Sequence, residues 1–297
     1  MSLPFVCPRC KTSWNLSEED IVRFSKRLPV KCVECGNEFD ILDGISEVIT
    51  SDNPFIQYTL RSNFSILGTS EITLGQLKEV DLKEKLDEIH RIFLTPISTA
   101  PYPVFCEAIN RGGSRFAILS SKLKDLPYPD NIQIGWVVYG NKQGFDIPLW
   151  RKLLSNAKGY EINGDFRMAI VELETAFEIF IVEYLRKGLK DKYSPNVLEH
   201  LFQHFKRVED ELTILFEIAT GKTLRQILKE ANQPKLYSKW QQHVKEKRDR
   251  TVHRGENIEE KEFKEGFKSV FKIILLLDPE ALNYLYHFTA LPDMSSK

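Results

Sequence analysis

The sequence lacks the features that would place the chain in a membrane or a secretory route. Its densest apolar run covers residues 273–277, far short of the roughly 20 apolar residues that span a bilayer. The first residues carry no basic segment followed by a long apolar one, so we expect no secretory signal. We therefore expect a cytoplasmic protein without a membrane partner, in which paired cysteines bind metal more readily than they form disulfides.

The chain also lacks an excess of charge. Its 41 Lys and Arg residues nearly balance 42 Asp and Glu residues, which leaves a formal net charge of -1. This balance excludes nucleic-acid binding through whole-chain charge, so such binding would need a local basic surface. We find no phosphate-binding loop, because the glycine pair at 112–113 is better interpreted as a hairpin turn. We find no internal repeat either.

Residue patterns divide the 297 residues into three predicted regions. Residues 1–42 hold four of the five cysteines. Residues 50–146 carry short apolar or alternating runs between Gly, Pro and Asn clusters, which predict a β-rich domain of unknown role. Residues 147–297 carry helical periodicity and predict an α-helical bundle. The predicted fold class is multidomain α+β.

In the middle region, the apolar runs predict strands at residues 55–60, 104–109 and 132–139. Residues 81–92 are expected to form a short helix inserted between these strands. Cys106 belongs to the second strand and has no activating base near it in the sequence, so we expect a buried free thiol.

In the last region, cap and stop signals separate the helices. Apolar periodicity and breaking residues predict helices over 166–185, 197–219 and 235–252, then one opened by a capping box of Asn257 with Glu260, and one opened by Asp278 with Pro279. The bundle is therefore expected to contain four or more helices.

Two Cys-x-x-Cys pairs stand near the start of the chain. Cys7 with Cys10 and Cys32 with Cys35 are separated by 21 residues. Zinc prefers four ligands in a tetrahedron and binds thiolates well. A segment of about 40 residues cannot build a sufficient hydrophobic core alone, so we expect a bound metal to stabilise its fold. The spacing predicts one structural Zn²⁺ ion without an open coordination position. Two disulfides or a redox-active pair are the alternatives that the sequence leaves open.

The residues around these cysteines resemble the short N-terminal zinc ribbons of many prokaryotic proteins. Trp14, Val30 and Phe39 are placed to form the small apolar core of such a ribbon, and Gly36 suits the tight turn after the second pair. Such ribbons commonly bind nucleic acid or a protein partner. The balanced charge of this segment does not choose between them.

The segment from Lys235 to Arg254 is locally basic, with seven Lys or Arg residues against two acidic residues. Within it, Arg248, Asp249 and His253 resemble the R-x(4)-H motif of HEPN domains. The helix predicted at 166–185 and the helix after the motif also resemble that family, over about residues 147 to 290. The resemblance implies a helical fold, a homodimer, and RNA binding or metal-independent RNA cleavage in a toxin or defence effector.

The resemblance implies a role for each motif residue. His253 would act as general base or acid when a ribose 2′-hydroxyl attacks the neighbouring phosphate. Arg248 would bind that phosphate and stabilise its charge, and Asp249 would orient His253. The product would be a 2′,3′-cyclic phosphate. Residues five apart on a regular helix lie about 140° apart around its axis, so Arg248 and His253 need a helix distortion or a partner subunit to converge.

Other interpretations stay open. Basic residues and a histidine at the C-terminal end of a helix also offset the helix dipole. The same bundle suits a non-catalytic dimeric scaffold or sensor that binds a partner through the ribbon. A DNA-binding regulator using the ribbon is a third alternative, although the ribbon has no basic excess. The acidic residues Glu172, Glu174 and Glu178 on the first long helix are expected on solvated faces.

Overall fold

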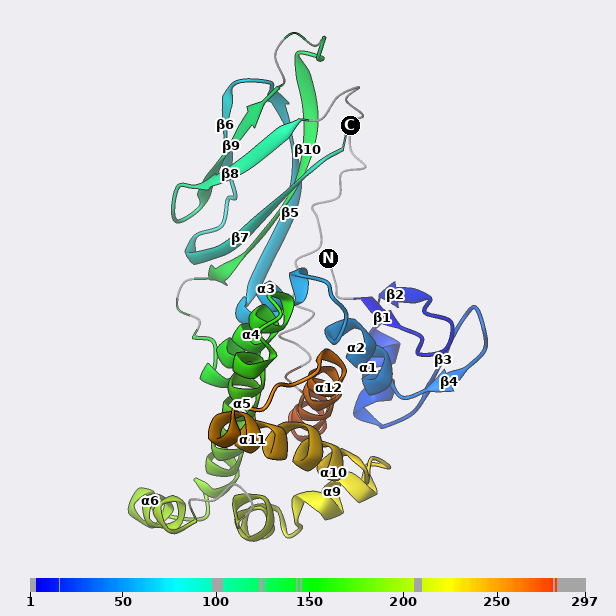
Figure 1. The fold of residues 1–297 in the computed structure, drawn as a ribbon, viewed down its shortest axis with the longest axis vertical. Coiled ribbons are helices and arrows are strands. Elements are labelled where there is room, and N and C mark those ends of the chain that lie inside the picture. The colour runs from blue at the N-terminus through cyan, green and yellow to red at the C-terminus, as the bar shows by residue number, and fades with distance from the viewer. Residues whose placement is uncertain are drawn as a thin grey trace. The chain divides into compact units, whose positions relative to one another are not determined.

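The computed structural model describes residues 4–15, 17–97, 104–122, 125, 127–142, 144, 146–205, 210–279 and 281. Their contacts form two compact units. Among the described residues, one unit holds Tyr58–Ile147, and the other holds the segments up to Gln57 and from Pro148 onward. No helix in these ranges is long and apolar enough to cross a membrane. Small N-terminal hairpins, a β-rich middle and C-terminal helices confirm a mixed α+β fold (Figure 1).

The β-rich unit consists of two three-stranded antiparallel sheets. Their strand orders are β5 (Phe64–Thr73), β10 (Asn131–Lys142), β7 (Leu86–Pro96), and β6 (Leu77–Asp81), β9 (Arg115–Ser121), β8 (Phe105–Asn110). Apolar residues of both sheets share one core, in which the rings of Phe116 and Trp136 meet edge to face at 5.4 Å. Strands β8 and β10 confirm the strands predicted at 104–109 and 132–139. Gly112 and Gly113 form the β8–β9 turn with positive φ.

Two expectations for this part of the chain are wrong. Residues 55–60 form helix α3 (Phe55–Arg61) instead of a strand. The Asn53 side chain accepts the Phe55 N–H at 2.9 Å, which satisfies one of the free donors at the start of a helix. Residues 81–92 form the end of β6 and much of β7 instead of a helix. Strand β7 pairs with β10, a partner more than 30 residues away that local periodicity does not reveal.

The helical part of the second unit is organised around a helical hairpin. Helix α4 (Leu149–Ile162) turns at Gly164 into α5 (Phe166–Leu189), and Asp165 caps α5 by accepting the Met168 N–H at 3.1 Å. The remaining elements are α6 (Pro195–His204), η1 (Glu211–Leu215), α8 (Phe216–Thr220), α9 (Leu224–Glu230), α10 (Leu236–Trp240), η2 (Gln241–Lys245), α11 (Glu246–Arg254) and α12 (Glu260–Leu277). Helix α12 packs on α5, α10 and η2. The long helix predicted from Phe166 is confirmed.

The other predicted helices differ in detail. Residues 235–252 contain a π-helical turn, η2, between α10 and α11. The single helix predicted over 197–219 is wrong, because α6 ends at His204, Phe205 leaves the helical conformation, and η1 and α8 follow from Glu211. A π-turn makes hydrogen bonds one residue wider than an α-turn, and periodicity does not foresee it. Gly221 and Gly255 end their helices in the left-handed conformation, which glycine adopts without strain. The helix expected to open at Asp278 lies almost wholly outside the described residues.

Helix α12 begins with a different capping box from the expected one. Glu259 and Glu262 form it, because each side chain bonds to the backbone N–H of the other residue. Asn257 and Glu260, which have the same spacing, precede and follow the true cap. Several acidic residues stand close together in this segment, so spacing alone cannot identify the capping pair.

The N-terminal segment consists of two small hairpins with a helix between them. These are β1 (Pro4–Val6) with β2 (Ser13–Asn15), then α1 (Glu18–Ser25), then β3 (Val30–Lys31) with β4 (Glu38–Phe39). The chain continues into α2 (Ile41–Ile49), an apolar helix that the sequence analysis missed. Helix α2 packs against β1 on one side and α12 on the other.

Lysines spaced four residues apart on α12 fix α2 to the bundle. Each pairs with an acidic residue of the α2 segment: Lys264 with Asp52 at 2.6 Å, Lys268 with Glu47 at 2.9 Å, and Lys272 with Asp43. The apolar residues of α2 are buried beside these pairs. The hairpins and the helices are therefore joined by a packed interface within one unit.

Gly44 in α2 provides a test of this packing. An added Cβ would lie 2.8 Å from the Phe5 ring and 2.9 Å from the Phe39 ring. We expect Gly44→Ala to destabilise the protein by about 1–2 kcal/mol, because overpacking outweighs the gain in helix propensity. Urea denaturation, which gives the free energy of unfolding, would measure this change.

Gly188 in α5 is the matched control. A Cβ there would meet only the Ala219 side chain, at an ordinary 3.8 Å. Gly188→Ala should therefore be neutral or stabilising by about 0.5–1 kcal/mol. Equal effects of the two substitutions would contradict the described packing of α2 on the hairpins.

Candidate functional site

The two Cys-x-x-Cys pairs lie in turns of the same design. In the first, the Lys11 N–H donates to the Cys7 carbonyl at 3.0 Å, and in the second the Gly36 N–H donates to the Cys32 carbonyl at 3.0 Å. Lys11 and Gly36 both have positive φ, 62° and 68°. Each turn thus directs two sulfurs to one side. This left-handed conformation costs Lys11 some free energy, whereas Gly36 adopts it without strain.

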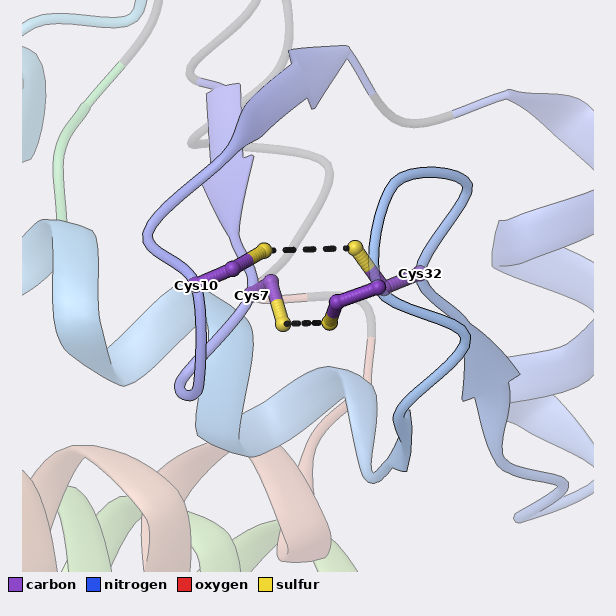
Figure 2. A group of neighbouring side chains, drawn as sticks. Cys7, Cys10 and Cys32 are labelled. Carbon is purple, nitrogen blue, oxygen red and sulfur yellow. Dashed lines mark hydrogen bonds between the residues drawn. The ribbon is translucent and has the colours of Figure 1, made fainter.

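The four cysteine sulfurs lie together. The Sγ atoms of Cys7 and Cys35 are 3.7 Å apart, those of Cys10 and Cys32 are 3.6 Å apart, and all four lie within 4.8 Å of one another. Figure 2 shows Cys10 facing Cys32 across the gap between the two turns. Four thiolates about 2.3 Å from one tetrahedral metal lie about 3.8 Å apart, so the cluster is positioned to coordinate one ion. A disulfide needs about 2.05 Å, which these pairs do not approach.

An aromatic cluster supports the cysteine turns. Phe5 is fully buried, with its ring 4.3 Å from the Trp14 ring and 6.1 Å from the Phe39 ring. Trp14, Val30 and Phe39 were predicted to form this core, and they do. Phe5 was missed, although it stands two residues before Cys7 in a strand, the position of an inward-facing neighbour.

The Arg–His segment lies on α11, which is held at both ends. At its C-terminal end the Arg167 guanidinium of α5 donates to the Gly255 carbonyl. At its N-terminal end Lys247 pairs with Glu262 of α12 at 2.7 Å. Thr251, midway, is buried and donates to the Glu256 carbonyl at 3.2 Å. The backbone that carries the motif is therefore fixed against α5 and α12.

Arg248 is paired on two sides. Its Nε lies 3.5 Å from Glu174 Oε2 on α5, and its Nη1 donates to Asp249 Oδ1 at 3.0 Å. The side chain is 34% exposed. The structure thus brings Asp249 to Arg248, while among the described residues it shows no contact between Asp249 and His253. Arg248 sits at the boundary between the helical core and solvent.

His253 lies in the last turn of α11 and is exposed. The π-turn η2 precedes Arg248, so it leaves the α-helical spacing between Arg248 and His253 unchanged. The two residues remain about 140° apart around the helix axis. In the described part of one chain, the structure does not bring the guanidinium and the imidazole into contact.

Glu174 is the site residue that the sequence analysis placed wrongly. It was expected on a solvated face, yet it is only 3% exposed. Burial raises its pKa, the neighbouring Glu178 raises it further, and Arg248 opposes them, which leaves a value of about 8. Glu174 stands four residues after Ile170 and three before Phe177, both fully buried. That spacing puts Glu174 on the buried stripe of α5, and this signal was available in the sequence.

Two further acidic side chains in this region have raised pKa values. Burial raises the pKa of Glu178, against the opposing charge of Arg248. Burial raises the pKa of Glu211 in η1 to about 7, with a contribution from the charge of Glu178. Glu174 and Glu178 of α5 and Glu211 of η1 therefore hold protons more tightly than solvated carboxyl groups do.

Cys106 differs from its expected burial. It is partly exposed and lines a cavity of about 470 Å³ between β7 and β8. Burial raises the pKa of its thiol. In the same cavity the His90 Nδ1 lies 3.3 Å from Glu88 Oε1, and burial lowers the pKa of His90. Cys106 is therefore a poorly ionised thiol at neutral pH.

No protein-family model, curated protein or solved structure matches this chain. What the residues can do chemically therefore rests on their own geometry.

The cysteine cluster makes a direct prediction. Native mass spectrometry should find one bound metal ion per chain, and Cys32→Ser should remove it. Loss of the ion should lower the thermal midpoint sharply, because structural zinc contributes roughly 10–16 kcal/mol of apparent binding free energy in small units.

Cys106→Ser is the matched control, since Cys106 lies outside the cluster. This variant should keep its metal and the wild-type melting behaviour. A wild-type protein that carries no metal, yet melts at the same temperature as Cys32→Ser, would contradict the metal site.

Proposed function

We propose that this protein is a cytoplasmic RNA-binding endoribonuclease of HEPN type that needs no metal for chemistry. The arrangement of α11 carries the proposal. Near the start of this helix, two acidic groups hold the partly buried side chain of Arg248. In its last turn, the imidazole of His253 is exposed. Guanidinium and imidazole groups are the two side chains needed to neutralise a phosphodiester and to move the proton of a ribose hydroxyl.

The proposal needs two copies of the chain. Because Arg248 and His253 do not meet within one copy, a symmetric homodimer would bring His253 of one copy to Arg248 of the other. Exposed apolar side chains near the motif support this arrangement. Val252 is 52% exposed on α11, and Met168 is exposed at the start of α5, whose Arg167 contacts the end of α11. A two-fold contact would bury such side chains.

The proposed reaction is a transesterification. The ribose 2′-oxygen attacks the adjacent phosphorus and passes its proton to neutral His253, while the bond to the 5′-oxygen breaks and that oxygen takes a proton from water. The products are a 2′,3′-cyclic phosphate and a 5′-hydroxyl. Arg248 would stabilise the charge that develops on the non-bridging oxygens. The exposed Arg250 and Arg254 would attract the RNA backbone.

We infer that the ion held by the four cysteines is zinc. Four thiolates in a tetrahedron suit zinc and close its coordination sphere, so the ion has a structural role in the N-terminal ribbon. Zinc would staple the two hairpins, while Arg248 and His253 would act without a metal.

A non-catalytic scaffold is the second candidate function. Val33, between the cysteines of the second pair, is 78% exposed. An exposed apolar side chain on a segment of balanced charge favours a protein partner over nucleic acid at that surface. The same homodimer would then display two ribbons instead of an active site.

The central experiment measures cleavage of single-stranded RNA with EDTA present. We expect Arg248→Ala and His253→Ala each to lower the cleavage rate at least about 100-fold, as loss of a charge-stabilising or proton-transfer group does. Matched controls are Arg111→Ala and His200→Ala, two exposed residues outside α11, which should cleave as the wild type does.

Mixing the two inactive variants tests the shared site. In a mixed dimer, one of the two sites regains both an intact Arg248 and an intact His253. Subunit exchange at random should therefore restore about a quarter of wild-type activity. RNA binding without cleavage by the wild type would reduce the proposal to a binding module, and absence of any RNA interaction would favour the scaffold.

A further inference from the structure

The guanidinium of Arg248 has three nitrogen atoms, and acidic groups of the chain lie against two of them. Glu174 faces Nε at 3.5 Å and Asp249 accepts from Nη1 at 3.0 Å. No partner for Nη2 is found in the described part of the chain. Glu174 Oε2 and Arg248 Nε are both buried and neither makes a hydrogen bond. Glu174 therefore acts on Arg248 through charge, and that charge depends on one proton.

We propose that Glu174 is a positioning residue for Arg248: by losing or gaining a proton it holds the guanidinium on α5 or leaves it free to pair with an anionic phosphate. The part of this inference that concerns RNA rests on the proposed function. The tether between α5 and α11 is a property of the folded chain and does not depend on that function.

The charged groups that face Glu174 come from its own helix and from the segment packed against it. Glu178 is on α5, whereas Arg248, Asp249 and Lys245 belong to α11 and η2. Glu211 of η1 faces Glu178 in turn. Burial and Glu178 raise the pKa of Glu174, while Arg248 and Lys245 lower it, and the result is about 8. The carboxyl group is therefore mostly protonated at pH 7 and mostly ionised at pH 9.

The direction of the effect follows from these charges. Below pH 8 Glu174 is neutral, so the positive charge of Arg248 is available to a phosphate. As pH rises through 8, a negative charge appears 3.5 Å from Nε and competes with the phosphate. By linkage, a phosphate bound at Arg248 raises the pKa of Glu174, so binding takes up a proton. Affinity for RNA should fall as the pH rises.

The first test needs no RNA. In protein labelled with ¹³C at glutamate and ¹⁵N at arginine, the Glu174 Cδ resonance should titrate near pH 8. The Arg248 Nε resonance should move at the same midpoint, and Glu174→Gln should abolish that movement. Glu172→Gln is the matched control, since Glu172 is on the same helix and accepts from Asn156 at 3.4 Å, away from Arg248. It should leave both titrations unchanged.

The second test measures binding of a 2′-O-methylated RNA oligonucleotide, which cannot be cleaved, by fluorescence anisotropy from pH 7 to pH 9. The affinity of the wild type and of Glu172→Gln should fall by up to about tenfold over this range, the limit for a single group whose pKa in the free protein is about 8. Glu174→Gln carries a permanently neutral group and should keep the affinity seen at pH 7. Arg248→Ala should bind weakly at every pH.

The outcomes separate the two ideas. If Glu174 titrates as a solvated glutamate, or if Arg248 Nε moves equally in Glu174→Gln, the positioning role is overturned. If Glu174→Gln shows the wild-type pH dependence of RNA binding, the role is also overturned. If the resonances behave as expected but no RNA binds at any pH, the positioning role holds and the proposed function fails.

Discussion

The structure depends on four sulfur atoms that join two hairpins too small to fold alone. Each hairpin contributes two cysteines, and the four sulfurs are positioned so that one shared metal ion would fix their spacing in place of a large core. Phe5, Trp14 and Phe39 then form one aromatic cluster that packs on Gly44 of α2. Helix α2 can approach so closely only because that residue has no side chain. The geometry of the cysteine cluster therefore affects the surface on which α2 packs.

Helix α2 is linked through α12 to α11, the helix that carries Arg248 and His253. Lysines of α12 pair with acidic residues of α2, and the opposite end of the network is the pair between Lys247 of α11 and Glu262 of α12. Gly266 of α12 lets the backbone at His243 pass at a distance that no side chain would permit. The ribbon and α11 are therefore braced by the same helix. A metal ion held by the four cysteines would therefore affect the geometry of α11 only through these packed contacts.

The buried carboxyl group of Glu174 on α5 determines the electrostatic environment of Arg248 on α11. A carboxylate at the interface of two helices is costly unless it is paired or protonated, and here both compensations are partial. Arg248 offers the carboxylate an opposite charge but no hydrogen bond. The raised pKa means that the carboxyl group is protonated, and so uncharged, over part of the neutral pH range. A buried carboxyl with these two properties is suited to the positioning role proposed for Glu174. The same carboxyl on a solvated face would have neither property.

The sequence by itself determined the features that depend on short spacing: the two cysteine pairs, the Asp165 cap, the glycine stops at Gly221 and Gly255, and the turn at Gly112 and Gly113. Each is decided within a few residues, because a metal ligand pair, a cap or a left-handed turn is satisfied locally. Only the tertiary structure decided that residues 86–96 are a strand, since the hydrogen bonds of β7 go to β10. It also decided that Arg248 meets Glu174, because two helices far apart in the chain must pack before a charge loses its water and its pKa moves.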